Sequence, residues 1–96
     1  MPRIDALEID DHILDKIESK HGVTFEEVED VCLSPASHQR RVRSRVILVL
    51  GQTRHGRYLA AIVAWRYPAY FVVSAREMEL HERRLHARQT KTRRGR

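Results

Sequence analysis

The stretch VILVLGQTRHGRYLAAIVAWRYPAYFVV, residues 46–73, decides the fold. It contains three apolar blocks separated by two turns rich in glycine, proline and polar residues: 46–50, 58–65 and 70–73, with turns at 51–56 and 66–69. Strands joined by such short connections pair antiparallel, because a parallel pair needs a crossover of a dozen or more residues. The stretch therefore predicts an antiparallel meander. Its first block is apolar without alternation and should be buried on both faces.

The residues before this stretch predict a further strand at the edge of the sheet. Residues 37–43 are polar and basic, and Val42 is their only large apolar side chain. Charged side chains commonly protect an edge strand against pairing with other chains. The sheet is thus expected to contain three to four antiparallel strands.

Two short helices are predicted before the sheet. In residues 11–21 apolar side chains recur at a helical spacing, and Gly22 supplies a stop. Thr24 and Glu27 have the spacing of a capping box, which predicts a second helix directly after Thr24. Pro35 ends this second helix, because proline cannot continue the hydrogen-bond ladder.

A third helix is predicted near the C-terminus. Ser74 and Glu77 repeat the capping-box spacing, and the helix would run to about residue 88. Residues 89–96 have four bases and no large apolar side chain, so they are expected to form a basic, disordered tail. The chain is therefore predicted to be a single α+β domain, residues 1–88, with two N-terminal helices, the meander sheet and a C-terminal helix.

The charge of the chain changes sign along its length. Residues 1–30 hold ten acids and three bases, whereas residues 31–96 hold fifteen bases and three acids. Most of these bases are arginine, whose planar guanidinium binds two phosphate oxygens at once. This asymmetry indicates a polyanionic partner, and nucleic acid is the first one to test.

Composition argues against several other classes of protein. Cys32 is the only cysteine, which excludes an internal disulfide and a cysteine-based zinc site within one chain. Residues 1–11 lack the apolar core of a signal peptide. The longest apolar run, residues 59–65, is far shorter than the roughly 20 residues that span a bilayer. We therefore expect a cytoplasmic protein with no membrane contact.

Four short motifs stand out along the chain: KHGVTFEE at 20–27, GRYL at 56–59, VSAREM at 73–78 and ERRL at 82–85. They resemble, in order and spacing, the motifs of the BrnT toxins, a family in the RelE-like superfamily of type II toxin–antitoxin systems. The chain resembles this family over roughly residues 8–88. The resemblance implies a small α+β fold with a curved antiparallel sheet. One departure is His86, where the last helix of the family often has tyrosine.

The resemblance also implies a function and partners. BrnT toxins are ribonucleases that arrest translation and are neutralised by a cognate antitoxin. The partners expected for this chain are therefore RNA and an antitoxin, which in turn would contact operator DNA, in a homodimer or a toxin–antitoxin heterotetramer. Two alternatives stay open on the same fold: a non-catalytic RNA- or DNA-binding module and a protein-interaction subunit.

The basic part of the chain offers too few carboxylates for a metal site. Beyond residue 30 there is no aspartate, and Glu77, Glu79 and Glu82 all fall on the predicted third helix. His81 and His86 would lie about 140° apart around that helix, so they would not share a ligand. We expect neither a metal ion nor another cofactor. Cleavage of RNA without a metal requires a proton acceptor, a proton donor and cations that stabilise the phosphate.

The predicted hairpin register brings basic residues to one end of the sheet. Folding about the last turn places Arg57 near Arg76, and the preceding turn carries His55 to the same end, beside a helix N-terminus that favours phosphate. We predict that Arg57 and Arg76 stabilise the phosphate and that Lys20, His21 or His55 transfers the proton. A structural role, as a helix cap or a solvated side chain, is the alternative for each of them.

Five further arginines are predicted to bind a nucleic-acid backbone: Arg43, Arg45, Arg54, Arg83 and Arg84. Arg43 and Arg45 should lie at the opposite end of the sheet from the predicted catalytic cluster. Arg83 and Arg84 would serve RNA or a protein partner equally well.

Overall fold

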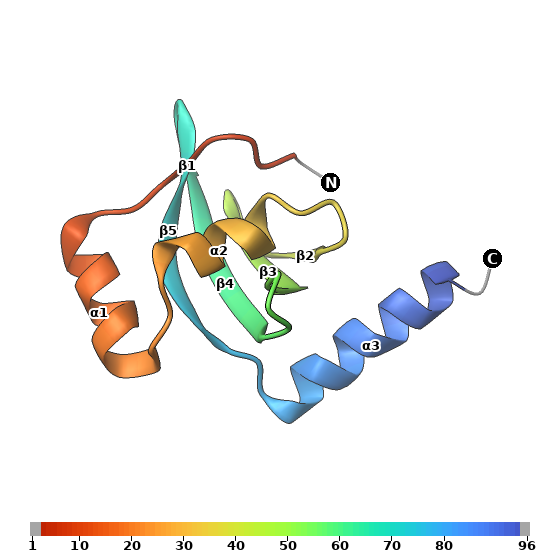
Figure 1. Cartoon of the computed structure of the whole chain (residues 1–96). Coiled ribbons are helices and arrows are strands. Elements are labelled where there is room, and N and C mark those ends of the chain that lie inside the picture. Colours follow the sequence, from red (N-terminus) through yellow and green to blue (C-terminus); the bar gives the residue numbers. More distant parts are fainter. Residues whose placement is uncertain (1–2, 95–96) are drawn as a thin grey trace.

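Five strands form one twisted sheet in the computed structural model, which describes residues 3–94 and the side chains of residues 3–90 (Figure 1). The strand order across the sheet is β1-β5-β4-β3-β2. In chain order the elements are β1 (Leu7–Glu8), α1 (Asp11–His21), α2 (Phe25–Cys32), β2 (His38–Arg43), β3 (Val46–Gln52), β4 (Tyr58–Arg66), β5 (Ala69–Glu77) and α3 (Leu80–Arg94). The α+β class and the order of helices and meander agree with the sequence analysis.

The sheet is mixed and larger than predicted. Strands β2 to β5 form the antiparallel meander, whereas β1 pairs with β5 in parallel, with Leu7 opposite Tyr70. The prediction of three to four antiparallel strands is therefore wrong in number and in the direction of one edge strand. A two-residue strand shows no alternation in a sequence. It is identified by backbone pairing alone, which continues where the N–H of Tyr70 donates to the carbonyl of Ala6 at 3.0 Å.

Strand β5 continues through the residues that were predicted to open the third helix. The Ser74–Glu77 spacing suits a capping box, but Arg76 lies opposite Ala60 of β4 and extends the ladder. This cross-strand pairing outweighs the local helix signal, as tertiary contacts commonly do. Helix α3 starts only at Leu80. The direction in which Arg76 points is therefore set by a strand and not by a helix.

Helix α3 also ends later than predicted. It begins with a cap in which the N–H of Glu79 donates to the carboxylate of Glu82 at 2.8 Å. It then continues to Arg94, so residues 89–94, assigned to a disordered tail from the sequence, are helical. These residues include no glycine or proline, and straight-chain residues such as Gln89 lose little entropy in a helix. Residues 95–96 of the predicted tail lie outside the described residues.

Helices α1 and α2 cover one face of the sheet, and most of the core lies there. Ile17, Val28 and Val49 meet in this layer, each 1% exposed or less. The capping box predicted for α2 is confirmed, with the side chain and backbone of Thr24 and Glu27 bonded in both directions. Local chemistry thus places α2, and burial of its apolar face holds it on the sheet.

Helix α3 lies against the other face, over a much smaller apolar cluster. Leu85 of α3 packs on Leu50, Ala60 and Met78 there. Along β3 the side chains alternate between the two faces, which is why Val49 and Leu50 belong to different clusters. Figure 1 shows α3 projecting away from the sheet. Side-chain polar contacts must therefore contribute to its position.

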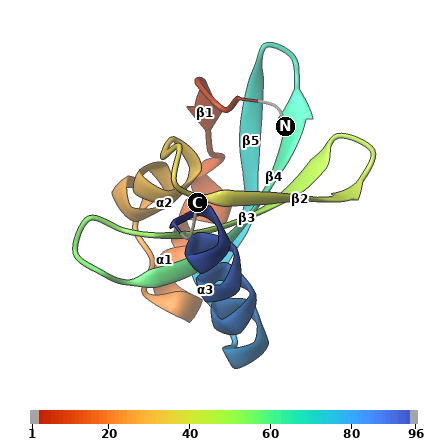
Figure 2. The same ribbon diagram turned by 90° about the vertical axis from the view of Figure 1, so that its right-hand side faces the viewer.

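The β2–β3 and β3–β4 turns lie at opposite ends of the molecule (Figure 2). At the β2–β3 end, the backbone N–H of Trp65 donates to the carbonyl of Arg45 at 2.7 Å. The Trp65 ring lies 5.0 Å from that of Tyr70. Trp65 is the only tryptophan of the chain.

Candidate functional site

Three hollows that share lining residues lie between α3 and the β3–β4 end of the sheet. The largest has a volume of about 690 Å³ and is lined in part by Tyr58, Arg83, Arg84 and His86. A hollow of about 290 Å³ shares His86 with it, and one of about 260 Å³ shares Tyr58 and Arg83 and reaches Arg57. We call these three hollows together the α3 groove.

His86 is a buried side chain that lines the α3 groove. It is 8% exposed, and its ring meets the ring of His38 edge-on at 4.7 Å and that of Tyr58 at 6.0 Å. The two Nδ1 atoms of His86 and His38 are 2.8 Å apart. Burial lowers the pKa of His86 below its usual value of about 6.5. At neutral pH this imidazole is therefore uncharged and able to accept a proton.

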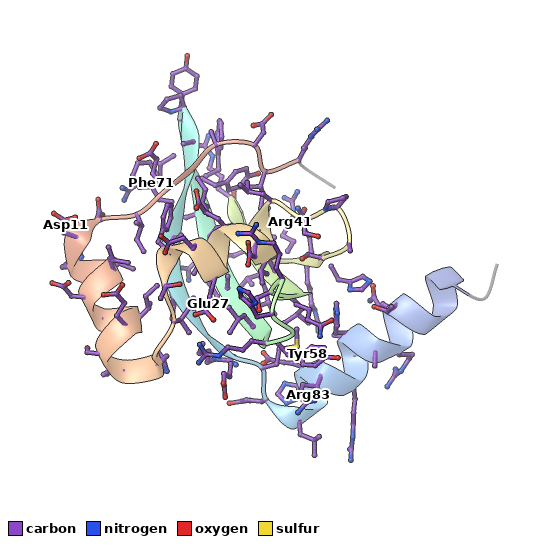
Figure 3. The ribbon with its side chains drawn as sticks, in the orientation of Figure 1. Asp11, Glu27, Arg41, Tyr58, Phe71 and Arg83 are labelled. Atoms are coloured by element: carbon purple, nitrogen blue, oxygen red, sulfur yellow. The ribbon has the colours of Figure 1, made fainter. Side chains whose placement is uncertain are left out.

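Tyr58 and Arg83 lie side by side where β4 meets the start of α3, as Figure 3 shows. The guanidinium carbon of Arg83 is 4.7 Å from the centre of the Tyr58 ring. Arg83 and its neighbour Arg84 are exposed and make no ion pair with the residues the structure describes. The groove thus combines an aromatic surface with two cations whose charge is not neutralised.

Arg57 is bound by protein groups on nearly every side. Its Nε donates to Glu77 at 3.0 Å, and its Nη1 donates to Glu27 at 3.0 Å. Nη1 also donates to the carbonyl of Gly22 at 2.7 Å, and Nη2 donates to that of His21 at 3.0 Å. Arg57 therefore fastens the α1–α2 junction to the end of β5.

Arg76 is bound in a similar way on the opposite face. It donates from Nη1 and Nη2 to the two carboxylate oxygens of Glu82, at 2.7 and 3.0 Å. This hydrogen bonding, followed by the hydrogen bond from the Glu79 backbone and by the charge of Arg76, holds the pKa of Glu82 below its usual value against the effect of burial. The pair joins β5 to the first turn of α3.

The predicted cluster of Arg57, Arg76 and His55 does not form. The three residues belong to the same end of the sheet, as the register required. However, Arg57 reaches Glu77 and α2 on one face, whereas Arg76 reaches Glu82 on the other. The prediction of convergence is wrong because it placed Arg76 in a helix and so missed the alternation of side chains along β5.

The remaining predicted catalytic residues lie outside the α3 groove. Lys20 and His21 are exposed at the end of α1, and only the backbone carbonyl of His21 contacts Arg57. His55 is exposed in the β3–β4 turn. The structure does not bring these three residues together in the α3 groove. Their roles in proton transfer stay predictions.

The predicted backbone-binding arginines fall into different surroundings. Arg54 is bound to Asp30 at 3.1 Å, although its side chain is 81% exposed. Arg43 and Arg45 are exposed at the β2–β3 turn and make no ion pair with the described residues. The neighbouring Arg40 and Arg41 are likewise exposed and make no ion pair with the described residues. We call Arg40, Arg41, Arg43 and Arg45 the β2 arginine stripe.

A metal site and a membrane-spanning helix both lack support in the part of the chain that the structure describes. No group of three or more His, Cys, Asp or Glu side chains there is placed to hold a metal ion. No helix among residues 3–94 is both long and apolar enough to cross a membrane.

No protein-family model and no curated protein sequence matches this chain. Among solved structures, it is similar to the 1.1 Å crystal structure of the Brucella abortus ribonuclease toxin BrnT, with a TM-score of 0.64 and 16% sequence identity. The fold is BrnT-like. The similarity covers 78% of this chain and 99% of the BrnT chain, so nearly all of the BrnT structure has a counterpart here.

On this BrnT-like fold, sequence reasoning missed the residues that the α3 groove brings together. The sequence places Tyr58 in a strand, as the structure confirms, but does not indicate that its ring lines a groove, and it marks His86 only as a departure from the family. A signal was present in the spacing of Arg83 and His86, which places both near one side of a helix. The contact of His86 with His38 joins residues 48 positions apart and had no local signal.

Proposed function

We propose that this protein is a toxin-like endoribonuclease that cleaves single-stranded RNA in the α3 groove without a metal ion. The observation that carries the proposal is the buried His86 beside Arg83 and Arg84 in one groove. The fold supports it, because a similar structure is that of a ribonuclease toxin.

The chemistry needs few groups, and the groove has them. The 2′-hydroxyl of the RNA attacks the adjacent phosphate while His86 accepts its proton, and acid–base help of this kind contributes about 10²–10⁴-fold. Arg83 and Arg84 stabilise the extra negative charge on the phosphate. The ring of Tyr58 offers a face on which an unpaired base stacks, a contact that is worth about 1–3 kcal/mol.

In this proposal Arg57 and Arg76 position the site and do not bind phosphate. A guanidinium that is already bonded to carboxylates has little charge left for a ligand, and both residues are in that state. Arg76 holds α3 through Glu82, and Arg57 holds the strand end that carries Tyr58. Loss of either would therefore lower activity indirectly, through the shape of the groove.

The β2 arginine stripe continues the path of the RNA away from the groove. Strand β2 starts at His38, next to His86, and carries Arg40, Arg41 and Arg43 outward. A row of cations whose charge is not neutralised attracts a phosphate backbone by releasing its counterions, without reading its sequence. The stripe accordingly supplies affinity, and the groove supplies the chemistry.

A neutralising antitoxin is the proposed protein partner. Its inhibitory segment would be acidic, since it must compete with RNA for the stripe and the groove. The proposal includes action on translated RNA in the cytoplasm, contact with operator DNA through the antitoxin, and assembly as a homodimer or a toxin–antitoxin heterotetramer.

The test is cleavage of a short fluorescent single-stranded RNA by purified protein in EDTA, compared with the His86→Ala variant. Cleavage by the wild type that is lost in the variant, while RNA affinity is kept, supports the proposal. Salt-sensitive binding with no cleavage by either protein would instead support the second candidate, a non-catalytic RNA-binding module. That candidate is favoured by one observation, the unneutralised charge of the β2 arginine stripe.

A further inference from the structure

We propose that His38 and His86 act as a two-residue proton relay, in which His86 exchanges protons with the RNA and His38 stores the charge. This inference rests on the proposed ribonuclease function and names a positioning residue for it. It concerns His38, a residue of the edge strand β2 that does not line the largest hollow of the groove.

The contact between the two rings is a single hydrogen bond between their Nδ1 atoms. Their Nδ1 atoms are 2.8 Å apart, so one hydrogen lies between them, with one ring as donor and the other as acceptor. When both rings are neutral, they must therefore hold opposite tautomers. When the shared hydrogen moves to the other Nδ1, the donor ring stays neutral only if its own Nε2 gains a proton. The acceptor ring then carries hydrogens on both nitrogens and becomes an imidazolium.

Only His86 presents its second ring nitrogen to the groove. His86 lines the largest hollow, and its Nε2 makes no hydrogen bond with a residue that the structure describes. The Nε2 of His38 is buried. Protons that His38 takes up through this contact must therefore pass through His86.

The proton balance of the relay is simple. Nε2 of His86 takes the proton of the attacking 2′-hydroxyl, and the Nδ1 hydrogen of His86 passes to Nδ1 of His38. His86 is again neutral, and His38 becomes an imidazolium. The leaving 5′-oxygen takes a proton from water, and the resulting hydroxide is neutralised when the relay returns its proton through Nε2.

The surroundings of His86 disfavour a positive charge on that ring. Arg83 and Arg84 of α3 line the largest hollow with His86, and Tyr58 of β4 meets its ring edge-on. Glu82, one turn earlier on α3, is already bonded to Arg76. A positive charge on His86 would face these cations in a buried setting, and burial already lowers its pKa. A charge on His38 lies one ring further from Arg83 and Arg84, which lowers the repulsion from these two residues.

The test combines kinetics with a measurement that needs no activity. The variants are His38→Gln, which keeps a hydrogen-bonding side chain without a titrating ring, and His86→Ala. His81→Gln, at an exposed position of α3, is the matched control. Cleavage of a labelled RNA is measured from pH 5 to 9, and ring nitrogen NMR reports the tautomers of both histidines.

We expect His86→Ala to lose at least 100-fold in kcat/KM and His38→Gln to lose about 10-fold with an altered pH profile and unchanged RNA affinity. The NMR spectra should show one Nδ1-protonated and one Nε2-protonated ring. A His38→Gln variant with the wild-type rate and pH profile overturns the relay alone. Opposite tautomers in a wild-type protein that does not cleave RNA overturn the ribonuclease proposal, and the relay with it.

Discussion

The arginines near α1 and α2 differ in their bonding from most arginines along α3 and β2. Acidic side chains from the first thirty residues bind Arg54, Arg57 and Arg66. Arg83 and Arg84 of α3 and the four residues of the β2 arginine stripe have no such partner among the described residues, although Arg76 on the α3 face is bonded to Glu82. The charge asymmetry of the sequence thus becomes neutralisation around α1 and α2 and an open positive surface along α3 and β2.

The same comparison separates structural from functional roles. Arginines that are bonded to carboxylates join elements of the fold, whereas unpaired arginines beside a groove are available to a polyanion. The α1–α2 face also contains most of the apolar core, while α3 rests on a few side chains. The α3 face contains less of the apolar core, and we place the function there.

The largest effect is expected for the α3 groove. Replacing His86 with alanine should lower RNA cleavage by about 10²–10⁴-fold, because a group that accepts a proton in the transition state contributes that much. Initial rates in EDTA measure the effect. His12→Ala, at an exposed position of α1, is the control and should cleave normally. Equal rates for both variants would remove His86 from the mechanism.

The β2 arginine stripe should contribute to affinity and not to chemistry. Changing Arg40, Arg41, Arg43 and Arg45 together to glutamine should weaken RNA binding about 100-fold at physiological salt and reduce the log–log salt slope by about 3. Fluorescence anisotropy over a salt series gives both values. Lys16→Gln on α1 should change neither appreciably. An unchanged slope in the fourfold variant would show that RNA does not follow β2.

On the α1–α2 face the expected loss is one of stability. Arg57→Ala removes hydrogen bonds to two carboxylates and two carbonyls, so the free energy of unfolding should fall by about 2 kcal/mol. Arg54→Ala is the matched variant, since its exposed pair with Asp30 should contribute only about 0.5 kcal/mol. Urea denaturation measures both. A folded, fully stable Arg57→Ala protein that no longer cleaves RNA would instead restore the catalytic role that the sequence suggested.

The smallest effect concerns pH and the Arg76–Glu82 pair. The folded protein holds the pKa of Glu82 below its usual value of about 4.3, chiefly through hydrogen bonds from Arg76. The stability from this pair is therefore fully present above that value and is lost as the pH falls through the lower, folded-state pKa. The melting-temperature difference between wild type and Glu82→Gln should narrow in acid. A difference that is constant from pH 7 to pH 3 would contradict this.

Elements that depend on local sequence signals were predicted better than contacts between distant parts of the chain. The capping box at Thr24 and the apolar blocks of the meander are complete within a few residues, so α2 and the strands could be recognised. At Ser74 an equally good local signal failed, because pairing with β4 decides the structure there. The His38–His86 contact and the faces of Arg57 and Arg76 depend on the register of whole strands, which short patterns do not contain.

The single tryptophan gives this protein an internal optical reporter. Trp65 lies at the β2–β3 end of the sheet, where its backbone N–H donates to the carbonyl of Arg45 and its ring is tilted against that of Tyr70. His86 lines the α3 groove at the other end. A short oligonucleotide confined to the groove should therefore leave the emission unchanged, whereas a longer strand that follows β2 should alter it. Intrinsic fluorescence can thus measure how many nucleotides the binding path accommodates, without any label.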